Sequence, residues 1–171
     1  MNDYIILIIA FGSLLLVSIY VILNRILLSD ERRRNVELLK SSKSITVPIR
    51  IHAYERLILF LERISPDSLL LKLKNQAQTN SDLHLAMLQQ IRLEYEHNLS
   101  QQLYVSIKIW ESVKATKENI ILSINDLAKH TDPNASSIDL ANKILDKLIS
   151  DGESPVSETI KEIKTEAQKL M

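Results

Sequence analysis

The sequence predicts an all-α protein in which one N-terminal transmembrane helix precedes an irregular cytoplasmic helical bundle of about five helices and an amphipathic C-terminal helix. Three observations support this fold class. The run Tyr4–Leu23 contains no charged residue. The chain has two glycines and four prolines in 171 residues, fewer than the turns of a β-rich fold need. Further along, apolar residues recur every three or four positions, which is the period of an amphipathic helix.

Residues 1–28 are predicted to form a membrane anchor. Because a helix rises about 1.5 Å per residue, the run Tyr4–Leu23 is long enough to cross the hydrocarbon core of roughly 30 Å. A cleaved signal peptide is the main alternative, but Met1-Asn2-Asp3 is not basic and the apolar run is longer than usual for such a peptide. A buried core helix is the other alternative.

The charged residues that flank this span predict its orientation. No Lys or Arg precedes the span, whereas several follow it, and the positive-inside rule then places the C-terminal side in the cytoplasm. We therefore expect a single-pass protein of the bacterial inner membrane, with the N-terminus outside, the C-terminal domain in the cytoplasm and the lipid bilayer as one partner. The membrane-flanking basic residues are Arg25, Arg32, Arg33 and Arg34.

A polar basic connector is expected over residues 29–46, followed by a cytoplasmic helical domain over residues 47–150. The first helix of this domain should begin near Pro48, because proline is favoured in a first helical turn. The five apolar residues Leu57–Leu61 cover all sides of this helix, which predicts that it is the most buried one.

Further helices follow in the domain, each preceded by a residue that caps helix N-termini. One of them carries Trp110 in an apolar stripe that only Lys117 interrupts, which predicts a buried indole ring. The expected starting points are Ser65, Asn80, Ser106 and Ser137.

Residues 151–171 are expected to form a linker and an amphipathic C-terminal helix. Val156, Ile160, Ile163, Ala167 and Leu170 follow a heptad-like spacing that is too short to sustain a coiled coil alone. The pattern leaves three arrangements open: a helix packed on its own domain, a helix docked on another subunit, or a frayed tail.

Composition excludes several classes of function. The chain has 21 basic and 21 acidic residues, and a neutral main domain argues against nucleic acid as a partner. It has no cysteine, which excludes disulfides and thiolate sites and suits a reducing cytoplasm. No glycine occurs between Gly12 and Gly152, so a glycine-rich phosphate loop is absent. We therefore expect no catalytic residue and no cofactor.

One weak candidate for a metal site remains. Glu94 and His97 match the Glu-x-x-His half of a di-iron carboxylate motif. A complete site needs a second such pair and two further glutamates, and the full set is missing, so the sequence predicts no metal.

Charged and amide residues around two segments are candidates for binding a partner protein, because exposed charges beside an apolar helix can pair across an interface. Intramolecular salt bridges are the alternative. The candidates are Glu55, Arg56, Glu62, Arg63, His97, Asn98, Gln101 and Gln102.

Three segments carry a resemblance to a known family: AYERLILFLERISP at 53–66, EYEHNLSQQ at 94–102 and YVS at 104–106. Together they resemble an uncharacterised family of small single-pass membrane proteins from Bacteroidota, a domain of unknown function. The resemblance implies a membrane anchor with a cytoplasmic helical domain, and it transfers no catalytic residue, cofactor or substrate.

The function favoured by the sequence is a membrane-anchored helical interaction module, an accessory or scaffold subunit of an inner-membrane protein complex. Its partners are then other subunits of that complex, and a homo-oligomer stays open. The alternatives are a membrane-bound helical enzyme with a carboxylate and histidine metal site, or a stalk-like structural subunit. A stalk should contain one long uninterrupted helix, which Pro48, Ser65-Pro66 and Pro133 argue against.

Overall fold

The computed structural model describes the backbone of residues 2–73, 75–152 and 154–170, and within them the side chains of residues 4–5, 11–25, 44–73, 75–150, 152 and 154–170. Two compact units, Met1–Thr46 and Val47–Met171, are each described by themselves. The helices are α1 (Asn2–Ile64), α2 (Pro66–Leu73), α3 (Asn80–Asn98), the 3-10 helix η1 (Leu99–Leu103), α4 (Ile107–Lys129), α5 (Ser137–Asp151) and α6 (Pro155–Gln168).

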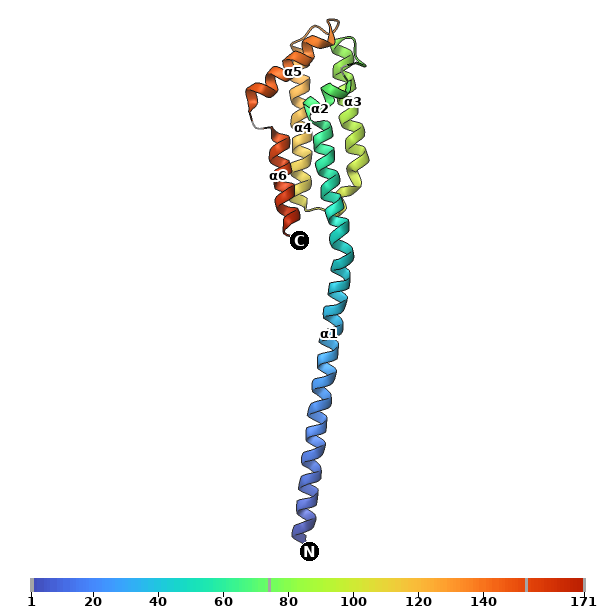
Figure 1. Cartoon of the computed structure of the whole chain (residues 1–171), viewed down its shortest axis with the longest axis vertical. Helices are drawn as coiled ribbons and strands as arrows, with labels where there is room; N and C mark the ends of the chain where they lie inside the picture. Colours follow the sequence, from blue (N-terminus) through green and yellow to red (C-terminus); the bar gives the residue numbers. More distant parts are fainter. Residues whose placement is uncertain (1, 74, 153, 171) are drawn as a thin grey trace. The chain divides into compact units, whose positions relative to one another are not determined.

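The described chain is all-helical, in agreement with its low glycine content and its apolar periodicity (Figure 1). The described residues form no strand beyond a single isolated bridge between Thr79 and Ser136. Gly152 is the one described residue with a positive φ, at 71°, and it ends α5. A left-handed residue at a helix end is the usual role of glycine.

The predicted transmembrane helix is wrong. Among the described residues, no helix is both long and apolar enough to cross a membrane. Arg25 is exposed, and its predicted role as a membrane flank stays a prediction. The side chains of Arg32, Arg33 and Arg34 lie outside the described residues.

The predicted helix start near Pro48 is also wrong, because α1 continues through residues 29–46 and contains Pro48 within it. Proline lacks an N–H group and crowds the carbonyl four residues earlier, so it weakens a helix without always ending it. The preference of proline for a first helical turn therefore did not mark a boundary here.

Within residues 47–171, the C-terminal part of α1 lies beside α3 and α4 (Figure 1). Hydrogen bonds join it to α3 and to α6. Helix α5 lies across the end where α3 begins. The predicted core helix is only partly covered. Leu57, Phe60 and Leu61 are buried, whereas Leu59 is 53% exposed. An apolar residue on every face of a helix does not tell which face the fold will cover.

Asn80 does not cap α3 as its sequence position suggests. Thr79 is the N-cap, and its hydroxyl and backbone exchange hydrogen bonds with Asp82 in a capping box. The buried Asn80 side chain instead donates to the carbonyl of Asp132 at 2.7 Å and accepts from the backbone N–H of Leu140 at 3.0 Å. It thereby ties the start of α3 to the loop before α5 and to α5 itself.

The aromatic rings of the bundle form a continuous row. Trp110 is buried and stacks on Tyr95 at 5.8 Å between ring centroids, and Tyr95 lies 6.1 Å from Phe60. Lys117, which interrupts the apolar stripe of its helix, places Nζ 4.1 Å from the Tyr95 ring centroid. This cation–π contact explains why a lysine occupies an inward-facing position.

The C-terminal helix packs on its own domain, which decides among the three arrangements left open by the sequence. Val156, Ile160 and Ile163 of α6 are buried. Beside them, polar side chains of α4 and α6 meet in two hydrogen bonds, Thr116 with Thr159 and Ser112 with Glu162, each at 2.7 Å. We call this contact, together with the Ser106–Glu166 bonds described below, the α4–α6 seam.

Candidate functional site

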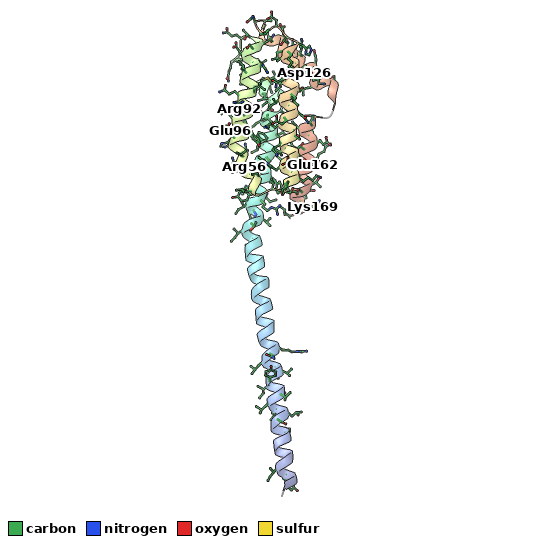
Figure 2. The ribbon with its side chains drawn as sticks, turned by 180° about the vertical axis from the view of Figure 1, so that it is seen from behind. Arg56, Arg92, Glu96, Asp126, Glu162 and Lys169 are labelled. Atoms are coloured by element: carbon green, nitrogen blue, oxygen red, sulfur yellow. The ribbon has the colours of Figure 1, made fainter. Side chains whose placement is uncertain are left out.

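One face of α1 presents two guanidinium groups on either side of an apolar strip. Arg56, Leu59, Phe60 and Arg63 are spaced three, four and seven residues from the first, so the helical repeat places them on the same side. Arg56 and Arg63 are exposed, and Phe60 is buried beneath them. Figure 2 labels Arg56 of α1 and, on α3, Arg92 and Glu96.

The C-terminal end of α3 faces this strip. Asn98 is 5% exposed, and its amide group donates to the carbonyl of Glu94 at 2.8 Å. Arg56 reaches across to this helix end, where Nε donates to Asn98 Oδ1 at 3.4 Å and a terminal N–H donates to the carbonyl of His97 at 3.3 Å. The last carbonyls of a helix lack intrahelical donors, so a cation is favourable there.

Glu94 neutralises part of the positive charge. One of its oxygens accepts from Arg63 at 3.3 Å, and the other accepts from Gln90 at 3.0 Å and lies 3.9 Å from Lys72 Nζ. The side chain of Glu94 is 12% exposed, whereas that of Arg63 is 57% exposed. The carboxylate is therefore covered while the guanidinium keeps donors that face solvent.

These residues surround a groove of about 250 Å³, which we call the α1–α3 groove. Arg56 and Arg63 line it on the α1 side, and Leu59 and Phe60 supply an apolar wall. The arrangement suits a carboxylate beside an apolar side chain, because guanidinium binds carboxylate through two parallel hydrogen bonds. The residues that line it are Arg56, Leu59, Phe60, Arg63, His97 and Asn98.

The structure divides the predicted partner-binding residues into two sets. Arg56, Arg63, His97 and Asn98 meet at the groove. The other predicted residues do not line it. Glu55 is exposed and lies 3.0 Å from His52, Glu62 is exposed, Gln101 is buried and donates to Ser100, and Gln102 is exposed.

The Glu94 and His97 pair does not form part of a metal cluster in the part of the chain that the structure describes, which contains no group of three His, Cys, Asp or Glu residues close enough to hold an ion. Both carboxylate oxygens of Glu94 already face cations or an amide. A metal ion would have to displace Arg63 from this carboxylate.

Sequence reasoning missed a second polar centre around Glu166. Tyr54 Oη donates to one Glu166 oxygen at 2.6 Å, and Ser106 Oγ donates to the other at 2.6 Å. Arg50 donates to Tyr54 Oη at 3.1 Å and to the carbonyl of Tyr104 at 3.0 Å. These groups lie up to 112 residues apart in the chain, so no local sequence pattern predicts that they are in contact. Their contacts hold α6 in place, which makes the centre structural.

The pKa values of this centre follow from its contacts. Burial alone raises the pKa of Glu166, but the hydrogen bonds from Ser106 and Tyr54 and the charge of Arg50 outweigh burial and lower it. Burial and the bond to Glu166 raise the pKa of Tyr54. The carboxylate is therefore held ionised and the phenol neutral.

Comparison with known proteins assigns the chain to a family and to no characterised protein. A family model described as "Family of unknown function (DUF7935)" matches residues 2–170. No curated protein and no solved structure matches the chain.

Proposed function

The chain belongs to the DUF7935 family, whose function is unknown, and we propose that it is a helical interaction module, an accessory or scaffold subunit of a protein complex. In this proposal, the α1–α3 groove holds an acidic segment of the partner protein. The carboxylate of that segment binds between Arg56 and Arg63, and a neighbouring apolar side chain rests on Leu59 and Phe60.

One observation supports the proposal: two exposed guanidinium groups line the same groove. Among the described residues that line it, none is acidic. Long cationic side chains on a free surface gain little from an exposed ion pair, since water and salt screen it. The same charges gain more when a partner covers them and brings its own carboxylate. A preformed groove with a fixed apolar wall favours such a contact.

The test compares two double variants of the same helix, Arg56→Gln/Arg63→Gln and Glu55→Gln/Glu62→Gln. Each removes two exposed charges from α1, but only the first removes groove residues. Full-length protein is immobilised, exposed to lysate of its source cells, and the retained proteins are quantified by mass spectrometry. We expect retention to fall about tenfold or more for the arginine variant, and to stay near wild type for the glutamate variant.

Capture alone does not support the proposal, because the difference between the variants is the measured quantity. Equal retention by both variants, or loss with the glutamate variant only, would contradict it. Thermal unfolding of each variant provides the control for folding. The Arg63–Glu94 pair is largely solvent-exposed at the arginine, so its loss should change stability by less than about 1 kcal/mol.

Further expectations belong to this proposal. The absence of cysteine in the sequence supports a reducing, cytoplasmic location for residues 47–171. The neutral net charge supports a protein rather than a nucleic acid as partner. The resemblance of residues 53–66 supports an origin of the family in Bacteroidota.

A stalk-like structural subunit is the second candidate, favoured by the uninterrupted course of α1 from Asn2 to Ile64. Insertion of Gly-Gly after Thr46 separates the two roles, because glycine pairs break a helix but leave the α1–α3 groove residues unchanged. Retention of the partner by the insertion variant supports the groove alone. Loss of the partner supports a role that needs helix continuity.

A further inference from the structure

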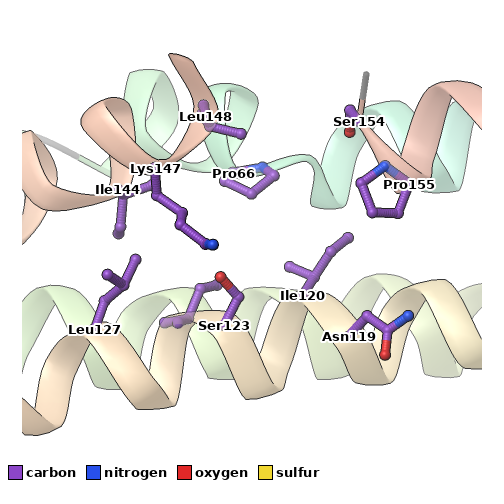
Figure 3. Close-up of a pocket in the computed structure, with 11 residues that line it drawn as sticks. Pro66, Asn119, Ile120, Ser123, Leu127, Ile144, Lys147, Leu148, Ser154 and Pro155 are labelled. Atoms are coloured by element: carbon purple, nitrogen blue, oxygen red, sulfur yellow. The ribbon is translucent and has the colours of Figure 1, made fainter. Parts of the chain in front are cut away.

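Helix α5 carries apolar residues on two of its faces. On the inner face, Ile144 is buried and points toward Leu127 of α4 across a cavity of about 270 Å³ (Figure 3). On the outer face, Ile138, Leu145 and Ile149 are 63%, 43% and 81% exposed. Because they are spaced seven and four residues apart, these three side chains form one stripe along the helix. The packing of α5 on its own domain uses the inner face and leaves the outer stripe uncovered.

Two aspartates accompany the outer stripe. Asp139 and Asp146 are exposed and directly follow Ile138 and Leu145 in the sequence. Among the described residues, neither carboxylate has an ion-pair partner. Residues seven apart on a helix lie on the same side and about 10 Å from each other along the axis. The outer face of α5 therefore presents two carboxylates at a fixed spacing beside exposed apolar side chains.

The α1–α3 groove has the complementary pattern. Arg56 and Arg63 are also seven residues apart, and Leu59 is 53% exposed between them. No described residue of α5 lines this groove, so the helix does not fill the groove of its own copy. An amphipathic helix that brings two carboxylates and an apolar stripe matches both the charges and the spacing of the groove.

Other acidic pairs of the chain fit the groove less well. In the described part of the chain, α1 and α4 also carry glutamates seven residues apart, but one member of each pair already contacts a basic side chain of its own helix. Glu55 lies 3.0 Å from His52, and Glu111 lies 2.8 Å from Lys114. The α5 pair is free of such contacts and is the one accompanied by an exposed apolar stripe.

We propose that the segment that occupies the α1–α3 groove is α5 of a second copy of this chain. Asp139 and Asp146 pair with Arg56 and Arg63, and the outer stripe of α5 rests on Leu59. This proposal rests on the proposed function, because it fills the same groove. Each copy offers one groove and one α5 face, so the contact is heterologous and joins copies head to tail.

Sedimentation velocity of the full-length protein over a concentration series tests the contact. The groove variant Arg56→Gln/Arg63→Gln and the helix variant Asp139→Asn/Asp146→Asn each remove the charges of one half of it. We expect wild type to associate as the concentration rises. The midpoint concentration of association should rise about tenfold or more for either variant alone.

A mixture of the two variants gives the sharpest distinction. The groove variant keeps a wild-type α5, and the helix variant keeps a wild-type groove. An equimolar mixture should therefore form dimers with a midpoint within about threefold of wild type, and no longer species, because the remaining ends of each dimer do not match. The control variant Glu55→Gln/Glu62→Gln should associate as wild type does, since neither residue lines the groove.

Three results would overturn the proposal: wild type that stays monomeric up to about 100 μM, a mixture that stays monomeric, or an equal loss of association in the control variant. Thermal unfolding of each variant verifies that it is folded. Failure of this proposal is distinguishable from failure of the proposed function. If wild type is monomeric but substitution of Arg56 and Arg63 still releases a different protein of the lysate, the groove binds a partner and that partner is not a second copy.

Discussion

The α4–α6 seam and the α1–α3 groove are both contacts between two helices, and both contain polar side chains. They differ in how far these side chains are exposed to solvent. In the seam, Thr116 and Thr159 are 4% and 6% exposed and bond to each other. In the groove, Arg63 is 57% exposed although it has a carboxylate partner. Polar groups are enclosed in one contact and left open to solvent in the other.

This difference separates a contact that completes the fold from one that is available to a partner. A buried polar atom costs free energy unless it is paired, so the seam is favourable only because its groups satisfy each other. In the described residues, no buried side-chain nitrogen or oxygen lacks a hydrogen-bond partner. The exposed guanidinium groups carry no such cost, because water satisfies them until a partner replaces it.

Trp110→Ala should have the largest effect, because the ring belongs to the aromatic row that ends at Phe60, a wall of the groove. Removing a buried indole leaves a cavity, and we expect a loss of about 3–5 kcal/mol in the free energy of unfolding. Urea unfolding followed by circular dichroism measures it. Ile107→Ala, on the same helix but 83% exposed, is the control and should change stability by less than about 0.5 kcal/mol. A small loss for Trp110→Ala would show that the row does not support the groove.

Glu166→Gln should rank second, because it weakens the two short hydrogen bonds that hold α6 against Tyr54 and Ser106. Bonds to a charged acceptor are the stronger class, so we expect a loss of about 2 kcal/mol. Glu158→Gln in the first turn of α6, which is exposed, is the matched control. Equal losses for both variants would mean that the Glu166 centre adds nothing beyond helix charge.

The same residue predicts a pH dependence. Because the pKa of Glu166 is lowered on folding from its ordinary value of 4.5, its contribution to stability is complete above that pH and is lost as the pH falls through the lower, folded value. Unfolding free energies measured from pH 6 downward should therefore fall less steeply for Glu166→Gln than for wild type. Parallel curves would argue against the lowered pKa.

A double-mutant cycle at Thr116 and Thr159 should give the smallest effect and the sharpest distinction. Either single change to Val leaves one buried hydroxyl without its partner and should cost about 1–2 kcal/mol. The double change replaces both hydroxyls with methyl groups of similar shape and should cost less than the sum of the two single changes. Additive losses would place water, and not the partner threonine, at these hydroxyls.

Periodicity predicted the helices because each helix repeats its own pattern along the chain. The stripe of Val156, Ile160 and Ile163 predicted the buried face of α6. It did not predict that α6 packs on α4. The Ser106–Glu166 contact joins residues 60 apart. Contacts of this kind depend on how the elements are arranged in space, which a local pattern does not encode.

The candidate site was predictable in part for the same reason. Charged residues beside an apolar helix predicted Arg56 and Arg63 as partner-binding residues. The polar segment after Tyr95 predicted His97 and Asn98. The sequence could not separate these residues from Glu55 and Glu62, because that distinction depends on which face of α1 meets α3.

The long sequence separation between Tyr54 and Glu166 has a consequence for folding during synthesis on the ribosome. A ribosome adds residues in order, so Tyr54 and Ser106 emerge well before the carboxylate that both of them bind, and 112 further residues must follow Tyr54 before it exists. During that interval Ser112 and Thr116 of α4 lack the side chains of α6 with which they form hydrogen bonds. The nascent chain is therefore most exposed to misassociation just before α6 is made, because α6 supplies the partners of these polar groups.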